Sequence, residues 1–315
     1  MKIARMEAPA LDDTGRAGLP ENPASQAQRE NPQTTAVNMK AEAQPVVLIT
    51  GASSGIGKIC AEHLHARSYR VYGTSRRAAA VATTASDSFQ LIAMDVTSED
   101  SVECAIQLIL SREGRVDVVC NNAGDGVAGS VEDTSIEEAR QQLDTNFFGV
   151  LRVCRAALPI MRRQGAGLIV NVSSLGGLVG LPFQGLYSAS KFAVEGMTEV
   201  MRMEVRPFGV RVALIEPGDF RTGFTAQRRK ALAAQQEGAY SERFSKALAT
   251  MERDESGGAD PVMVAHLLER IITSKSPRPR YKVGGLFQKL ATGFLRKVLP
   301  QKLYEYLLMA SYGIA

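Results

Sequence analysis

The segment Val46-Val-Leu-Ile-Thr-Gly-Ala-Ser-Ser-Gly-Ile-Gly-Lys58 joins a β-branched apolar run to three closely spaced glycines. An apolar run of this length is typical of a strand buried on both faces. We expect the strand to end in a tight glycine turn and a helix to open at Ile56. Gly51, Gly55 and Gly57 would let the backbone approach a pyrophosphate that the helix N-terminus can bind. A strand, a glycine turn and a helix in this order therefore predict a dinucleotide site.

Further strands are expected downstream of this segment, separated by helical stretches. Alternation of strands with helices predicts βαβ units that build a parallel sheet covered by helices on both faces. The fold class is therefore a single α/β domain with a doubly wound sheet, and a late helix over 261–273 should pack back on it. The apolar segments that we interpret as strands are 46–50, 69–74, 89–95, 116–121, 167–172 and 210–216.

A second constellation is Leu186-Tyr-Ser-Ala-Ser-Lys-Phe-Ala-Val-Glu-Gly196. On a helix, Tyr187 and Lys191 lie on one face, one turn apart. A cation there favours phenolate, so we expect the pKa of Tyr187 to fall well below about 10. A tyrosine tuned in this way can act as a general acid or base. Alone, this spacing is usually an ordinary exposed pair, and its weight comes from the other motifs.

Several motifs in order make the chain resemble the classical short-chain dehydrogenase/reductase family over about residues 45–273. The run from Ser174 to Tyr187 is most similar to the branch that contains 17β-hydroxysteroid and retinol dehydrogenases. The motifs are Thr50-Gly51-x-x-x-Gly55-x-Gly57, Asn121-Asn122-Ala123-Gly124, Ser174, Tyr187-x-x-x-Lys191 and Pro217-Gly218. The resemblance implies a Rossmann-type fold, hydride transfer between a nicotinamide and a carbonyl or alcohol carbon, and a dimer or tetramer.

The resemblance also assigns the reacting side chains. It implies that Tyr187 exchanges the proton, that Ser174 positions the carbonyl oxygen, and that Lys191 contacts the nicotinamide ribose. Asn146, in Leu-Asp-Thr-Asn-Phe-Phe-Gly, matches the family asparagine that helps to hold a water leading from Lys191 to solvent. No metal is needed by this mechanism, and no cluster of His and Cys residues suggests one.

Cofactor contacts follow from the same resemblance. It implies that Asp95 and Val96 contact adenine and that Thr222 holds the nicotinamide carboxamide. The full set of expected cofactor-binding residues is Gly51, Ser53, Ser54, Gly55, Ile56, Gly57, Arg76, Asp95, Val96, Asn122, Ala123, Gly124, Tyr187, Lys191, Pro217, Gly218 and Thr222.

The end of the second strand bears on which dinucleotide is bound. A carboxylate at this position binds the ribose 2′-hydroxyl of NAD, whereas an arginine accommodates the 2′-phosphate of NADP. Here the segment is Gly73-Thr-Ser-Arg-Arg77, without an acid. We therefore expect Arg76 to favour NADP(H), with NAD(H) as the alternative cofactor. A solvated surface pair is the competing interpretation of Arg76 and Arg77.

The whole chain has 315 residues, is 45% hydrophobic and carries a net charge of +4. This size fits one α/β domain with tails. Residues 1–44 are polar, mixed in charge and without apolar periodicity, so we expect a disordered extension. They lack the apolar core of a secretory signal, which predicts a cytoplasmic protein, and Met39 is an alternative start. Residues 45–274 would form the catalytic domain, and the family resemblance implies a substrate lid at about 220–258.

The last segment, residues 275–315, is basic and amphipathic. From Leu286, apolar residues recur at helical spacing, and lysines and arginines occupy the positions between them. Such a tail can lie on an anionic membrane surface through residues 285–309, close over an apolar substrate, form a subunit contact, or simply pack on its own domain. It contains no nucleic-acid-binding module. Its charged residues are Lys275, Arg278, Arg280, Lys282, Lys289, Arg296, Lys297 and Lys302, against Glu305.

These observations predict an NADP(H)-dependent oxidoreductase that interconverts a ketone or aldehyde with an alcohol on a hydrophobic substrate. One alternative is an alcohol dehydrogenase for a steroid or retinoid. A second is a non-catalytic dinucleotide-binding scaffold, because a fold does not determine a function. Ser174, Tyr187, Lys191 and Asn146 are all present, which favours catalysis over a scaffold.

Overall fold

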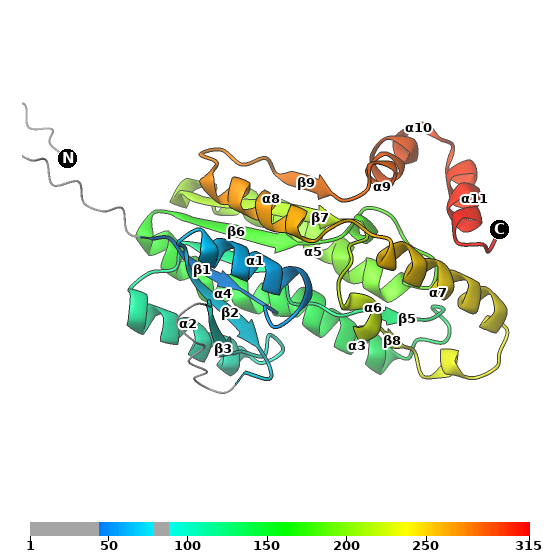
Figure 1. Ribbon diagram of the computed structural model, residues 1–315, viewed down its shortest axis with the longest axis horizontal. Helices are drawn as coiled ribbons and strands as arrows, with labels where there is room; N and C mark the ends of the chain where they lie inside the picture. Colours follow the sequence, from blue (N-terminus) through cyan, green and yellow to red (C-terminus); the bar gives the residue numbers. More distant parts are fainter. Residues whose placement is uncertain (1–43, 79–87) are drawn as a thin grey trace, which may run out of the picture. The chain divides into compact units, whose positions relative to one another are not determined.

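Seven parallel strands form the centre of the fold in the order β3-β2-β1-β4-β6-β7-β9 (Figure 1). The computed structural model describes residues 44–78 and 88–315, so the extension expected over 1–44 lies almost wholly outside the described residues. The strand order reverses between β1 and β4, and ligands of such sheets bind at the carboxyl ends of the strands near this switch point. The strands are β1 (Val46–Ile49), β2 (Arg70–Ser75), β3 (Gln90–Ala93), β4 (Val118–Asn121), β6 (Gly167–Val172), β7 (Val210–Pro217) and β9 (Arg280–Val283).

Helices cover both faces of the sheet, as the doubly wound prediction requires (Figure 1). Leu48 of β1 packs in the core beneath α2, α4 and α5, and Ile49 packs in the core beneath α1 and α8. Both side chains are fully buried, which explains the continuous apolar run in this strand. The covering helices are α1 (Gly55–Ala66), α2 (Glu99–Glu113), α4 (Gly149–Gln164), α5 (Gly185–Glu204) and α8 (Val262–Thr273).

Smaller elements gather around the carboxyl ends of the strands. Two short strands pair in parallel as a separate sheet, and a π-helical turn over Asp144–Phe148 joins α3 to α4. Residues 220–258, the expected lid, hold α6, β8 and α7. The elements in this region are β5 (Val127–Ala128), α3 (Ile136–Leu143), α6 (Phe224–Gln227), β8 (Arg229–Lys230) and α7 (Ser241–Ser256).

The C-terminal segment first adds β9 to the sheet edge, beyond the expected domain end at 274, and then forms helices (Figure 1). Ile314 is buried against Ala247 and Met251 of α7, so the chain end packs on the lid. Across residues 44–78 and 88–315, no helix has the length and apolar character needed to cross a bilayer. The tail helices are α9 (Leu286–Leu290), which continues through a π-helical turn (Ala291–Leu295) into α10 (Arg296–Val298), and α11 (Gln301–Ser311).

Candidate active site

The turn after β1 has a backbone that only glycine can adopt without strain. Gly51 and Gly55 have φ of +68° and +56°, in the left-handed region. A Cβ at position 57 would lie 2.5 Å from Gly51 O and 2.4 Å from Asn122 Nδ2. The three glycines therefore allow the loop after β1, the start of α1 and the loop after β4 to approach one another closely.

The N-terminus of α1 is free to bind an anion. Ser54 is its N-cap residue but makes no capping hydrogen bond through its side chain, and the first turn contains no acid. By contrast, α3 begins with a capping box between Ser135 and Glu138. Uncapped N–H groups and the helix dipole favour a negative charge at this point. Ser53, Ser54 and Ile56 thus surround a site that fits the pyrophosphate of a dinucleotide.

Hydrogen bonds fasten the loop after β4 to the loop after β1. Thr50 Oγ1 accepts from the backbone N–H groups of Asn122, at 2.9 Å, and Ala123, at 2.8 Å. Thr222 reaches this region from the other side, since its Cβ lies 3.8 Å from where a Cβ at Gly55 would stand. The structure therefore brings Thr222 to the glycine turn, although the two are far apart in the sequence.

The remaining expected cofactor residues end their strands at the same edge of the sheet. Asp95 follows β3, and its Oδ1 accepts from Thr97 N at 2.9 Å and Thr97 Oγ1 at 2.8 Å. Val96 is buried. Arg76 follows β2 and is exposed. Burial raises the pKa of Asp125, and the charges of Arg229 and Arg76 oppose this rise, so the Arg76 guanidinium lies within electrostatic reach of the loop after β4.

Ser174 and Tyr187 converge on Gly176. A Cβ at position 176 would lie 3.4 Å from Ser174 Oγ and 3.3 Å from Tyr187 Cε1. Ser174 follows β6 and accepts a 3.0 Å hydrogen bond from Gly176 N, whereas Tyr187 lies in the first turn of α5. Both hydroxyl groups can therefore reach one oxygen atom of a bound ligand.

The structure shows that the expected fall in the pKa of Tyr187 is wrong for the chain by itself. Burial raises this pKa, and it outweighs the hydrogen bond with Ser174 and the charge of Arg228, which lower it. Spacing along a helix locates a cation but does not show how deeply the phenol is buried. Tyr187 therefore holds its proton at neutral pH in this structure.

Lys191 and Asn146 lie together beneath Gly124. A Cβ at position 124 would stand 3.7 Å from Lys191 Nζ and 3.2 Å from Asn146 Oδ1. Lys191 is buried, and its Nζ donates to Val172 O at 3.0 Å while lying 5.9 Å from the centre of the Tyr187 ring. Burial lowers the pKa of Lys191 to about 8, although the charges of Glu195 and Asp125 oppose this effect.

Asn146, within the π-helical turn, uses its whole side chain to join this turn to α5. Its Oδ1 accepts from Asp125 N at 2.9 Å, and its Nδ2 donates to Asp125 O at 2.9 Å and Ser190 Oγ at 3.1 Å. Ser190 Oγ in turn donates to Tyr187 O at 2.7 Å. Asn146 thereby ties the loop after β4 to the helix that carries Tyr187 and Lys191.

The expected lid lies beside Tyr187, but sequence patterns did not indicate which of its side chains reach this residue. The Phe224 and Tyr187 rings lie 6.0 Å apart, and Arg228 follows one helical turn after Phe224. In Gln227-Arg-Arg-Lys230, Arg228 resembles a solvent-exposed basic residue, yet its side chain is only 3% exposed. Gln288 of α9 also accepts from Asp219 N at 3.1 Å, so the tail contacts the segment that follows Pro217 and Gly218.

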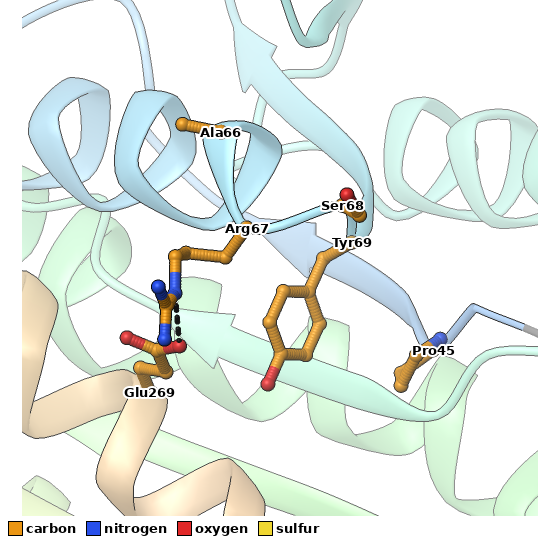
Figure 2. A pocket seen from close by; sticks show the side chains of 6 residues that line it. All are labelled: Pro45, Ala66, Arg67, Ser68, Tyr69 and Glu269. Atoms are coloured by element: carbon orange, nitrogen blue, oxygen red, sulfur yellow. Dashed lines mark hydrogen bonds and ion pairs between the residues drawn. The ribbon is translucent and has the colours of Figure 1, made fainter.

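A surface pocket of about 470 Å³ lies elsewhere on the molecule (Figure 2). Its wall includes a 2.8 Å hydrogen bond from Arg67 Nε to Glu269 Oε1. The pocket lies where β1 and β2 begin, at the edge of the sheet opposite to the glycine turn, and is therefore separate from the site above. The residues that line it are Pro45, Ala66, Arg67, Ser68, Tyr69 and Glu269.

Comparison with known proteins agrees with this geometry. Residues 45–233 match the family described as short chain dehydrogenase. A 3-ketodihydrosphingosine reductase of Bacteroides thetaiotaomicron is 42% identical over 85% of this chain and 98% of its own length. Human 17-beta-hydroxysteroid dehydrogenase type 1 is 40% identical over 58% of each chain. This second similarity agrees with the branch that the run from Ser174 to Tyr187 indicates.

Solved structures extend the similarity to the fold. A short-chain dehydrogenase from Streptomyces avermitilis superposes with a TM-score of 0.72 at 33% identity, covering 87% of this chain and all of the other. Among similar structures some hold NAD or NADH and others NADP. The chain therefore belongs to the short-chain dehydrogenase/reductase family of oxidoreductases, which act on alcohol and carbonyl groups with a nicotinamide dinucleotide.

Proposed function

We propose that the chain is an NADP(H)-dependent reductase of a hydrophobic ketone or aldehyde, with Ser174, Tyr187, Lys191 and Asn146 as its catalytic set. The observation that carries the proposal is the convergence of the Ser174 and Tyr187 side chains on Gly176, at the same edge of the sheet as the uncapped N-terminus of α1. A dinucleotide held by that N-terminus would supply the hydride.

In this mechanism Tyr187 donates its proton to the carbonyl oxygen as negative charge develops there. The Ser174 hydroxyl donates a hydrogen bond to the same oxygen, which orients the carbonyl and stabilises its charge. The raised pKa of Tyr187 supports the direction of reduction, because a phenol that keeps its proton at neutral pH is ready to act as the acid.

Lys191 would hold the cofactor ribose and restore the proton to Tyr187. Its pKa of about 8 lets the ammonium group exchange protons near physiological pH. Asn146 would position both residues through Ser190 and the backbone of Asp125.

The cofactor preference would depend on Arg76. It is exposed at the end of β2, without an acid in the segment Ser75-Arg-Arg77, so a ribose 2′-phosphate would meet a guanidinium and no carboxylate. NAD(H) lacks that phosphate and would gain nothing from Arg76.

Measuring NADPH and NADH oxidation with a panel of medium-chain and long-chain ketones and aldehydes tests the proposal. We expect the unaltered chain to turn over with NADPH and to have a higher kcat/KM with NADPH than with NADH. Arg76→Ala should lower this ratio of kcat/KM values about 10- to 100-fold, because charge-assisted hydrogen bonds contribute about 1.5–3 kcal/mol. Arg77→Ala is the matched control. Equal use of both cofactors by the unaltered chain would contradict the preference, and cofactor binding without any turnover would favour a scaffold.

An apolar wall above Tyr187 supports a hydrophobic substrate. Phe224 lies against Tyr187, and the Phe183 and Phe244 rings lie 5.6 Å apart. These two rings belong to an apolar cluster in which α7 of the lid contacts β5 and the residues before α5, with Ala128 and Leu248. The Bacteroides relative is named for a ketone reductase, which supports a ketone as the reacting group. The relative named for a hydroxysteroid dehydrogenase keeps a steroid-type alcohol as the second candidate substrate.

We also propose that the chain forms a homo-oligomer. An apolar groove of about 490 Å³ runs between α4 and α5, with Leu151 and Leu158 on one wall and Met197 and Val200 on the other. Large apolar side chains are exposed beside it, including that of Met203. A second copy of the chain would remove this surface from water.

Residues 285–309 support our further proposal of peripheral contact with an anionic membrane. Leu286, Phe287, Leu290, Phe294 and Val298 recur on one side of this helical segment, and Phe287 is 73% exposed. Three basic residues, Lys289, Arg296 and Lys297, lie among them, and Lys302 and one acid, Glu305, follow in α11. Exposed apolar and basic side chains on one helical segment are the features of helices that bind in the interface of an anionic bilayer.

Flotation with vesicles tests this contact. We expect the chain to float with vesicles that contain anionic lipid. Phe287→Glu with Phe294→Glu should lower this binding by more than about 100-fold, because burying each of the two phenylalanines contributes about 1.5–3 kcal/mol. Ile136→Glu, at a comparably exposed apolar position on α3, is the control. If the double variant floats as well as the unaltered chain, the membrane contact is refuted. If the double variant sediments differently from the unaltered chain in the absence of vesicles, this surface instead binds a second copy of the chain.

A further inference from the structure

The lid carries a polar cluster to the edge of Tyr187. Phe224 packs between Gly126 and Tyr187, since a Cβ at position 126 would lie 3.0 Å from Phe224 Cζ and 3.9 Å from Tyr187 Cδ2. Arg228 lies behind Phe224, with its Cζ 5.5 Å from the ring centre. Burial is the main cause of the raised pKa of Tyr187, and the charges of Arg228, Glu255 and Asp219 also act on it, so these groups lie within electrostatic reach of the phenol.

Arg228 has one hydrogen-bonding group without a partner. Its side chain is 3% exposed, and Nη2 donates to Glu255 Oε1, whose carboxylate also accepts from Thr225 Oγ1. Among residues 44–78 and 88–315, no acceptor reaches the buried Nη1. A buried N–H group without an acceptor is costly, so an oxygen atom of a ligand that enters the cluster would satisfy Nη1.

Asp219 adds a carboxylate that no cation of the cluster neutralises. Its Oδ2 accepts from Gln288 Nε2, an uncharged partner in α9. The only arginine of the cluster, Arg228, is paired with Glu255, so the two carboxylates outnumber it. Tyr312 lies within electrostatic reach of the same cluster: burial raises its pKa, and the charges of Asp219, Arg228 and Glu255 also act on it.

The titration of Asp219 agrees with this excess of negative charge. Burial and the neighbouring charges of Glu255 and Asp254 together raise the pKa of its carboxyl to about 6, against the hydrogen bond of Gln288 and the charge of Arg228. A cation placed beside Asp219 would relieve this repulsion. An anionic group would instead meet two carboxylates.

We propose that Asp219, Arg228, Glu255 and Tyr312 form a polar subsite that binds a protonated amine and an adjacent hydroxyl of the substrate, next to its reacting carbonyl. The amine pairs with Asp219, and the hydroxyl oxygen accepts from Arg228 Nη1. The rest of the substrate is apolar and lies against the Phe183 and Phe244 cluster. This inference rests on the proposed reductase function and narrows its substrate to hydrophobic amino ketones.

Calorimetric titration of the full chain tests the subsite without turnover. The probes are a medium-chain 2-amino alcohol, the plain alcohol of equal length and the fatty acid of equal length, each with NADP⁺ present. We expect the amino alcohol to bind about 10- to 100-fold more tightly than the plain alcohol, as hydrogen bonds to charged groups allow. Asp219→Asn should remove that difference, and Asp254→Asn, an exposed neighbour, should preserve it.

Each outcome decides the proposal. The proposal is overturned if the unaltered chain binds the two alcohols equally. It is also overturned if the fatty acid binds more tightly than the amino alcohol, because Arg228 would then bind an anionic group. This comparison does not depend on whether a variant folds. If the chain prefers the amino alcohol but reduces no ketone, the subsite stands and the reductase function is refuted. If it reduces plain and amino ketones at equal kcat/KM, the reductase function stands and the subsite is refuted.

Discussion

Tyr187→Phe is expected to lower kcat about 100- to 10,000-fold, the usual contribution of a general acid, and to leave folding and cofactor binding intact. Phenylalanine keeps the ring that packs beside Phe224 at 6.0 Å. It removes only the hydroxyl group that would protonate the carbonyl oxygen. Steady-state kinetics with NADPH, together with a fluorescence titration of the cofactor, measures both effects.

Controls for Tyr187→Phe separate loss of the acid from loss of structure. Tyr69→Phe makes the same chemical change at the opposite edge of the sheet, in the pocket of Figure 2, and should keep full turnover. Ser174→Ala removes the second hydroxyl group and should lower kcat less than Tyr187→Phe, because the proton donor remains. Retained turnover in Tyr187→Phe would refute the assignment of the acid.

Features of the fold that depend on residues close together in the sequence could be predicted from the sequence. Val46 to Ile49 is apolar at every position because both faces of β1 are covered, and glycines follow where φ is positive. Tyr187 and Lys191 share a helix, so their relative placement follows from helical geometry alone. Six strands of the large sheet lie within or next to the expected segments for this reason.

Features that depend on contacts between distant segments could not be predicted. Residues 280–283 have the sequence Arg-Tyr-Lys-Val, which resembles part of a basic tail, yet they form the edge strand β9. Arg228 lies in a basic run but is buried because Glu255, on another helix, pairs with it. The pKa of Tyr187 depends on how the lid packs over α5. Helical spacing carries no information on burial of that kind.

Arg280 lies in β9 at the centre of a partly buried ionic cluster behind α5. Its Nη1 pairs with Glu216 Oε1 of β7 at 2.8 Å and with Glu195 of α5, and its Nη2 pairs with Glu199 Oε1 at 2.6 Å. Glu195 and Glu216 are buried, whereas Glu199 is exposed. Arg280 therefore fastens the strand edge to the helix that carries Tyr187 and Lys191.

Arg280→Met is expected to lower the free energy of unfolding by about 3–5 kcal/mol, because it leaves two buried carboxylates facing each other without a cation. This loss is a large share of the free energy of unfolding of a typical domain, which is about 5–15 kcal/mol. Denaturant titration measures the loss. Glu199→Gln, which removes the exposed partner, should cost less than about 1 kcal/mol.

The loss in Arg280→Met should also depend on pH. Burial and the charge of Glu216 already raise the pKa of Glu195, and Arg280 opposes this effect. Without Arg280 the pKa rises further, so the folded variant binds a proton that the unfolded chain releases at neutral pH. Its stability should then fall as pH rises from 5 to 8, relative to that of the unaltered chain.

Neutralising the acids provides the decisive comparison. If uncompensated charge causes the loss, adding Glu195→Gln and Glu216→Gln to Arg280→Met should restore most of the stability, since a buried ion cluster can be replaced by neutral groups of similar size. If the triple variant is as unstable as Arg280→Met, then packing of the arginine side chain against α5 and β7, and not its charge, holds the catalytic helix to the edge of the sheet.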